Sequence, residues 1–120
     1  MAITVTSPSA AKAGWVKNAT SADASGCEQI LAAGGAGTEH VIEHCVISSD
    51  SAISVTLGGG ETSGAVTTAL IGPVTFAAGQ MVEWSFLGRS GGILVGSNTA
   101  ITVDASGAGN INVFLEGTTR

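Results

Sequence analysis

The chain of 120 residues has little charge and few aromatic side chains. Asp, Glu, Lys and Arg together make up 11% of the sequence, against roughly 25% in an average soluble domain, and tyrosine is absent. Nine carboxylates outnumber four formal cations, which gives a net charge of −5. Because binding to nucleic acid depends on clustered Lys and Arg, this composition disfavours a nucleic-acid partner.

Long apolar runs and cysteine frameworks are also missing. The first six residues have neither the basic start nor the apolar core of a secretory signal, and the most apolar stretch, residues 69–79, contains Pro73. A membrane-spanning helix needs about 20 apolar residues. We therefore expect no membrane partner and synthesis in a cytoplasm. Cys27 and Cys45 are too few for a disulfide framework; two buried thiols are the first expectation, and a cross-strand bridge is the alternative.

Small and β-branched residues dominate what is present. Gly, Ala, Ser and Thr account for about half of the chain, and the mean hydropathy is +0.43. Disorder requires low hydrophobicity with high net charge, so we expect one folded domain. In a monomer, neutral faces of this kind would leave apolar surface and sheet edges exposed. The composition therefore favours burial against copies of the chain or against a large scaffold.

Alternation of apolar and polar residues predicts short strands. In the clearest run, residues 52–57, the side chains of Ile53, Val55 and Leu57 share one face, and Gly58 begins a turn. Further runs are residues 27–33, 38–48, 74–76, 80–87, 93–95, 100–104 and 111–115. The glycine-rich turns between them recur about every 8–14 residues, a spacing typical of an antiparallel sandwich or jelly roll. No segment predicts a helix.

We therefore predict an all-β protein, an antiparallel jelly-roll-like β-sandwich of about eight strands over residues 26–120. Residues 1–25 are expected to form an extended N-terminal arm, because after Ile3 and Val5 the only large side chain is Trp15. A frayed terminus is the alternative, and Trp15 favours an arm that docks on a neighbour. The expected core consists of Val41, Ile53, Val55, Leu57, Phe76, Val82, Trp84, Phe86, Ile101, Val103, Ile111, Val113 and Leu115.

No pattern in the chain predicts an enzyme. Residues 88–92 match the G-x-S-x-G nucleophile elbow, but a β-branched run follows where the elbow needs a helix, and both histidines precede Ser90. On a strand, His40 and His44 would lie roughly 13 Å apart, which is too far for one zinc ion. We expect no catalytic residue, no metal and no cofactor. The two histidines are interpreted as solvated or interfacial edge residues, with contact between copies across an axis as one form of this.

Three stretches resemble small jelly-roll proteins encoded among the structural genes of tailed bacteriophages. They are residues 40–52 (HVIEHCVISSDSA), 71–79 (IGPVTFAAG) and 98–113 (NTAITVDASGAGNINV), within a resemblance that covers residues 27–117. Such proteins are commonly capsid decoration or cement proteins, often trimers on local three-fold axes of the shell. The resemblance implies a homotrimer on the outer surface of a phage capsid. The major capsid protein would be its partner and the virion its location.

The expected contact residues follow from this interpretation. Lys12, Trp15 and Lys17 are candidates for contact with the capsid, and His40 and His44 are candidates for the trimer interface. Three weak contacts on one trimer would give an avidity that each contact alone lacks. Two alternatives stay open. One is a jelly-roll module on a fibre or tail that recognises a glycan or host surface, and the other is a subunit of a tail or head-completion ring.

Overall fold

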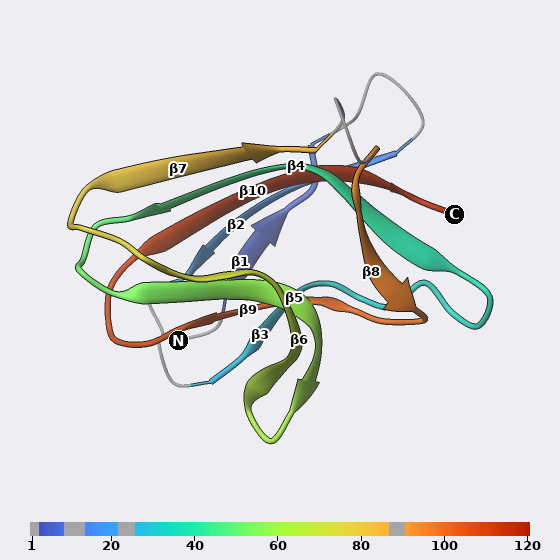
Figure 1. The fold of residues 1–120 in the computed structure, drawn as a ribbon, viewed down its shortest axis with the longest axis horizontal. Coiled ribbons are helices and arrows are strands. Elements are labelled where there is room, and N and C mark those ends of the chain that lie inside the picture. Colours follow the sequence, from blue (N-terminus) through green and yellow to red (C-terminus); the bar gives the residue numbers. More distant parts are fainter. Residues whose placement is uncertain (1–2, 9–13, 22–25, 87–90) are drawn as a thin grey trace.

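The computed structural model describes residues 3–8, 14–21, 26–86 and 91–120, and within these ranges it contains ten β-strands and no helix (Figure 1). The strands are β1 Thr4–Thr6, β2 Trp15–Ser21, β3 Glu28–Leu31, β4 Glu39–Ser49, β5 Ser54–Thr62, β6 Ala65–Thr75, β7 Gln80–Ser85, β8 Ile93–Ser97, β9 Ile101–Ala105 and β10 Ile111–Thr119. They form two antiparallel sheets that enclose one hydrophobic core, which confirms the predicted all-β sandwich.

The strand order is that of a jelly roll. The larger sheet, called sheet A, has the order β1-β2-β10-β4-β7, and β8 pairs with the first part of β4 beside β7; sheet B has the order β3-β9-β5-β6. Without β1 and β8, the remaining strands divide into four in sheet A (β2, β10, β4, β7) and four in sheet B (β3, β9, β5, β6). The chain therefore changes sheet repeatedly, as in two interlocked Greek keys.

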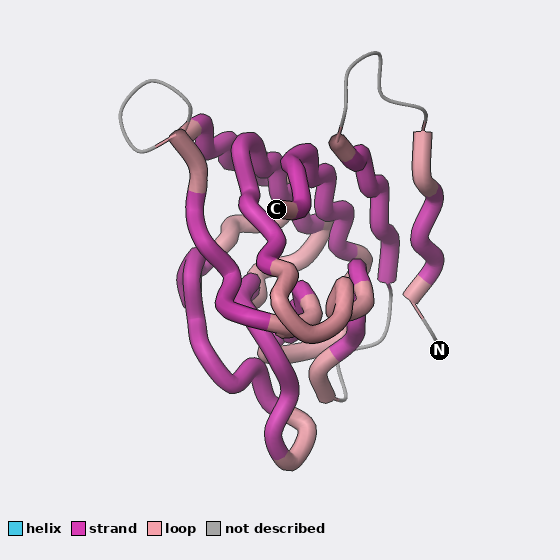
Figure 2. The backbone as a smooth tube through the Cα atoms, turned by 90° about the vertical axis from the view of Figure 1, so that its right-hand side faces the viewer, coloured by secondary structure: helices cyan, strands magenta, loops and turns pink. Residues whose placement is uncertain are grey.

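The prediction that residues 1–25 form an extended arm is wrong for residues 15–21. β2 pairs with β10 over seven residue pairs, β1 pairs with β2, and Figure 2 shows these strands in line with the rest of sheet A. Ala19 is 1% exposed and belongs to the core. The sandwich therefore includes β1 and β2, and Trp15 packs on its own chain. The local sequence of this segment, which consists mostly of small residues, could not predict that it pairs with β10.

The hairpin of β5 and β6 extends beyond the predicted strands. Ser63 and Gly64 connect the two strands, with φ angles of 53° and 80°. A type I′ turn has positive φ at both central positions and matches the twist of a hairpin. The glycines at 58–60, which were predicted to end a strand, instead lie inside β5. A side chain on Gly58 would overlap the backbone of Thr68 on β6, so glycine permits the close approach of these two strands.

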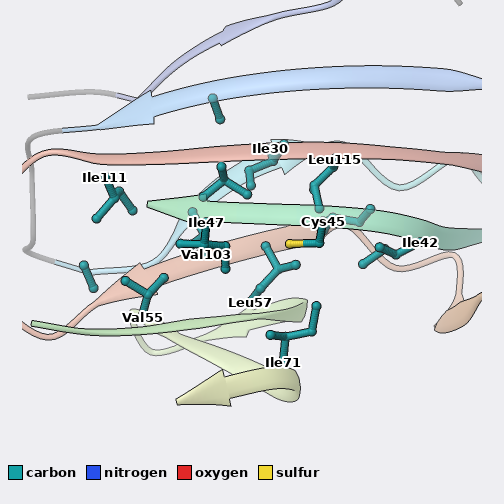
Figure 3. Packing of buried hydrophobic residues seen from close by; sticks show 14 of the residues in the cluster. Ile30, Ile42, Cys45, Ile47, Val55, Leu57, Ile71, Val103, Ile111 and Leu115 are labelled. Atoms are coloured by element: carbon teal, nitrogen blue, oxygen red, sulfur yellow. The ribbon is translucent and has the colours of Figure 1, made fainter. Parts of the chain in front are cut away.

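The core lies between the two sheets and contains most of the predicted residues (Figure 3). Ten of the thirteen are buried, whereas Val82, Trp84 and Phe86 are only partly buried because they lie on or just after the edge strand β7. The buried residues that the prediction omitted are Ala19, Ile30, Ile42, Cys45, Ile47, Ile71, Val95 and Ala105.

A β-bulge in β4 explains the burial of Ile42. Glu116 of β10 pairs with His44 and Gly117 pairs with Ile42, so Glu43 is an extra residue in β4. Ile42 and Cys45 are three positions apart and would face opposite sides of a regular strand, yet both are fully buried. The alternation of apolar and polar residues in the sequence does not show at which residue the inward side of β4 changes.

Gly117 lies at the bulge because no side chain fits there. A Cβ atom on Gly117 would lie 2.8 Å from the ring of Trp15 and still closer to the carbonyl oxygen of Val41. Gly107, by contrast, has no positive φ, and its Cβ would meet only a methyl group of Ile53 at 3.3 Å.

We expect Gly117→Ala to lower the free energy of unfolding by about 1–3 kcal/mol, the cost typical of overpacking. The contact is with backbone, so relief requires β4 and β10 to separate. Gly107→Ala is the matched control, with a smaller loss. Urea unfolding of both variants measures the difference, and equal losses would show that the Gly117 contact relaxes freely.

The two cysteines are free, and they differ in exposure. Cys45 is fully buried, and burial raises its pKa to about 12. Cys27 is partly exposed; burial raises its pKa, a hydrogen bond with Thr102 lowers it, and the Asp104 carboxylate raises it further. The expectation of two buried thiols is therefore confirmed for Cys45 and wrong for Cys27.

Thiol labelling checks this difference. A maleimide is expected to modify one thiol of the native chain and two thiols after denaturation, because Cys45 is shielded by both sheets. Cys27→Ala should abolish native labelling, whereas Cys45→Ala should leave it unchanged. Rapid native labelling in Cys27→Ala would contradict the placement of Cys45.

Candidate functional site

Three cross-strand rows of side chains cover the outer face of sheet A. The register places them as Thr4–Thr20–Asn112–Ser48–Met81, Thr6–Asn18–Phe114–Val46–Glu83 and Val16–Glu116–His44–Ser85. Figure 3 shows the alternate positions Ile47, Cys45 and Leu115 directed between the sheets, so the rows face outward. Most of these outward side chains are short and uncharged.

His44 is the centre of the charged part of this face. Its Nε2 atom lies 2.5 Å from Oε2 of Glu83, and its Nδ1 atom lies 3.1 Å from Oε1 of Glu116. The ring also packs edge-on against Phe114, with 6.2 Å between ring centroids. An ionised carboxylate only accepts hydrogen bonds, so the Nε2 contact needs a proton on that nitrogen. The neutral tautomer with its proton on Nε2 meets this requirement, and the Nδ1 contact with Glu116 is not aligned as a hydrogen bond.

This cluster is not arranged as a metal site. The carboxylates of Glu83 and Glu116 approach opposite nitrogens of one ring, so the three side chains do not converge on a single ion. No group of three or more His, Cys, Asp and Glu that could hold a metal occurs among the described residues. Instead, the cluster connects β7, β4 and β10. Since Glu83 and Glu116 are 61% and 48% exposed, each pair contributes only about 0–1 kcal/mol.

His40 lies on the other side of the bulge and is buried within the chain. It is 4% exposed; its Nε2 atom lies 2.7 Å from the carbonyl oxygen of Ala32, and its Nδ1 atom lies 2.7 Å from Oγ1 of Thr119. The carbonyl only accepts, so Nε2 donates, and the hydroxyl donates to Nδ1 in the neutral ring. Both ring nitrogens are used within the chain, so neither is free for another copy, and the placement of His40 at a trimer interface stays a prediction. The same prediction for His44 stays open.

The candidates for capsid contact do not form one surface. Lys12 lies outside the described residues. Trp15 packs partly buried against the core and edge-on to His40, with 6.1 Å between ring centroids. Lys17 donates a 2.6 Å hydrogen bond to Oγ of Ser7. Trp15 and Lys17 alternate with Val16, so they lie on the side of β2 opposite to the three rows.

A groove of about 540 Å³ lies at one end of the outer face. Its lining is mainly hydroxyl and amide side chains: Thr4, Thr20, Ser21, Ser48, Ser49, Asp50, Gly79, Asn110, Ile111 and Asn112. Asp50 accepts hydrogen bonds at 2.8 Å from Oγ of Ser51 and from the backbone and side-chain nitrogens of Asn110. These bonds, first that of Ser51 and then those of Asn110, lower the pKa of Asp50. The carboxylate therefore connects the β4–β5 turn to the β9–β10 turn.

Asp50 and Asp104 are expected to affect stability in opposite directions as pH changes. A lowered pKa means that the folded chain holds Asp50 charged, so its contribution is present above the ordinary Asp pKa of about 3.9 and is lost as pH falls through the folded pKa. Burial raises the pKa of Asp104, a hydrogen bond from the Ala105 backbone lowers it, and Glu28 raises it. Its charge therefore costs stability at neutral pH.

Thermal unfolding across pH tests these signs. Asp50→Ala should melt below the parent chain at pH 7, and the gap should close in acid. Asp104→Asn should melt at or above the parent at pH 7, and this advantage should shrink as pH falls. A constant gap for Asp50→Ala at all pH values would show that its carboxylate charge is not involved.

The period of two in residues 80–87 and 111–115 puts Glu83 and Phe114 opposite the core faces of their strands, but it does not bring these residues or Glu116 to His44. The missing information was which strands are neighbours. Within the described ranges, no helix is long and apolar enough to cross a membrane. Comparison of the chain with family models, with curated proteins and with solved structures gives no match.

Proposed function

We propose that the chain is a virion structural protein, a homotrimeric decoration or cement protein that binds the outer surface of a bacteriophage capsid and stabilises the shell. The observation that carries the proposal is the outer face of sheet A. Of its fourteen side chains in three rows, only His44, Glu83 and Glu116 are titratable, and these three lie in contact with one another. The jelly-roll strand order agrees with the resemblance that suggested this function.

This face has the composition of a surface that packs against protein. Short hydroxyl side chains lose little rotamer entropy when they are buried. Val16, Val46 and Phe114 are half-buried and Met81 is 68% exposed, so the rows also offer apolar contact. The carboxylate of Glu83 keeps its hydrogen-bond partner His44 when water is removed, which limits the cost of burying it.

In the proposed trimer, the outer face of sheet A of one copy packs against a different surface of the next. Such a heterologous contact closes into a ring when the rotation between copies is three-fold. His44 would lie at this contact. Lys12 and Lys17 stay the proposed contacts with the major capsid protein, and three such contacts on one trimer give avidity.

The test introduces a charge into the centre of this face. Val46 lies in the middle row between Phe114 and Glu83, so Val46→Lys can pair with Glu83 in a single folded chain. At a contact between copies, the same lysine would have to lose its water. We expect the parent chain to sediment at about three times 11.7 kDa at low concentration, and Val46→Lys to sediment as one chain. A capsid-binding assay should show weaker binding by this variant.

Ser97→Lys, on the exposed end of β8, is the matched control and should keep the trimer. Thermal unfolding verifies that each variant is folded. A parent chain that stays monomeric at every concentration and does not bind capsids would overturn the proposal. A ring of about six or twelve copies that forms without passing through a trimer would favour a tail or head-completion component instead.

A second candidate, recognition of a glycan, is favoured by the groove at the end of the same face. Hydroxyl and amide groups of Thr20, Ser48, Asn110 and Asn112 are suited to hydrogen bonds with sugar hydroxyls. No aromatic side chain lines it among the described residues, so the stacking that sugars commonly use is not supplied there. Binding on a glycan array that is lost in Asn112→Ala and kept in Val46→Lys would support this candidate over the decoration protein.

A further inference from the structure

The strand β6 presents a free edge that is longer than the other sheet edges of the described structure. It pairs with β5 on one side and with no other strand. β6 has eleven residues, whereas the edge strands β1, β3, β7 and β8 have three, four, six and five. Its backbone groups on the free side are therefore a template for pairing with a strand of another chain.

The first part of β6, residues 65–69, lacks the features that usually prevent such pairing. Edge strands are commonly protected by short length, by charged side chains, by proline or by β-bulges. Here no charged residue occurs between Glu61 and Glu83, and both Pro73 and the register shifts of β6 against β5 lie beyond residues 65–69. By comparison, β3 carries Glu28 and β7 carries Glu83. The exposed residues 67–69 of β6 are Thr, Thr and Ala.

We propose that the edge of β6 pairs antiparallel with the β6 edge of a second copy of this chain, across a two-fold axis. A second copy supplies an uncharged partner for residues 65–69, whereas the edge strands β3 and β7 carry Glu28 and Glu83. Charge favours the same occupant. Each copy carries −5, so repulsion between copies is least where neither strand has a charged side chain. A two-fold axis brings identical strands together antiparallel, the arrangement of ordinary strand addition.

The contact would deepen the proposed function, because it would link one trimer to the next. It rests on the proposed function only in taking the linked unit to be a trimer. Adjacent three-fold positions of an icosahedral shell are related by two-fold axes, so pairing through β6 would join neighbouring trimers into a net. A single pair of strands buries little surface, so we expect the contact to be weak in solution. On a shell, where trimers are held side by side, the effective concentration is high.

The experiment measures native mass over a wide range of concentrations for the parent chain, Val46→Lys and Thr68→Lys. Thr68 is exposed on β6, and lysine there should block pairing without entering the core. We expect the parent mass to double from trimer to a pair of trimers as concentration rises. Thr68→Lys should stay a trimer, and Val46→Lys should change from monomer to dimer. Thr68→Val, which keeps the strand uncharged, should restore the doubling.

The two proposals fail in different ways. A parent chain that changes from monomer to dimer and forms no trimer would overturn the trimer and support the β6 contact. A parent chain that never doubles, or a Thr68→Lys chain that doubles as the parent does, would overturn the β6 contact. Binding of an extended capsid segment at β6 without doubling would also overturn it, because the occupant would then be a different chain. Thermal unfolding of Thr68→Lys near the parent temperature shows that its result comes from the edge.

Discussion

The register of β10 between β2 and β4 is the constraint on which the rest of the sandwich depends. Along β10, Val113 and Leu115 enter the core while Phe114 and Glu116 face outward. The same register aligns His44 with Glu116 and leaves Glu43 as the extra residue of β4. It continues to the end of the chain, where the backbones of Glu39 and Arg120 exchange two hydrogen bonds. A shift of one residue would turn every one of these side chains to the opposite face.

The bulge in this register separates two histidines that are close in sequence and gives them different environments. His40 is buried with both nitrogens bonded inside the chain, so it helps to hold the ends of the strands together. His44 lies on the outer face between Glu83 and Glu116. Only His44 is therefore placed to respond to another surface. One extra residue in a strand thus separates a structural histidine from one that is available for contact.

The two surfaces proposed for assembly differ in their physics. The outer face of sheet A offers side chains, and its contact would depend on packing and on the removal of water from the cluster at His44. The edge of β6 offers backbone hydrogen bonds, and its contact would depend on the absence of charge. Side-chain contact closes a ring when its geometry fits, whereas edge pairing between identical strands produces a two-fold link. Residues 65–69 of β6 carry no charge and the outer face of sheet A carries few, so both surfaces lie where repulsion between copies is least.

Much of this architecture was determined by local sequence. The period of two in residues 52–57 and 111–115, together with the glycine-rich turns, predicted an all-β sandwich and most of its core, because alternation directly reports which side chains face inward. The low charge and the small side chains predicted surfaces suited to assembly. These features depend only on residues near one another in the chain, so they can be read without knowledge of the fold.

Strand neighbours and register were decided by the tertiary structure alone. Residues 15–21 have a weak local pattern and became part of sheet A because β10, almost a hundred positions later, supplies their hydrogen-bond partners. The burial of Ile42 depends on the bulge opposite Gly117, and the cluster at His44 depends on three strands that are distant in sequence. Pairing energy belongs to both strands at once, so the pattern of either strand alone does not contain it.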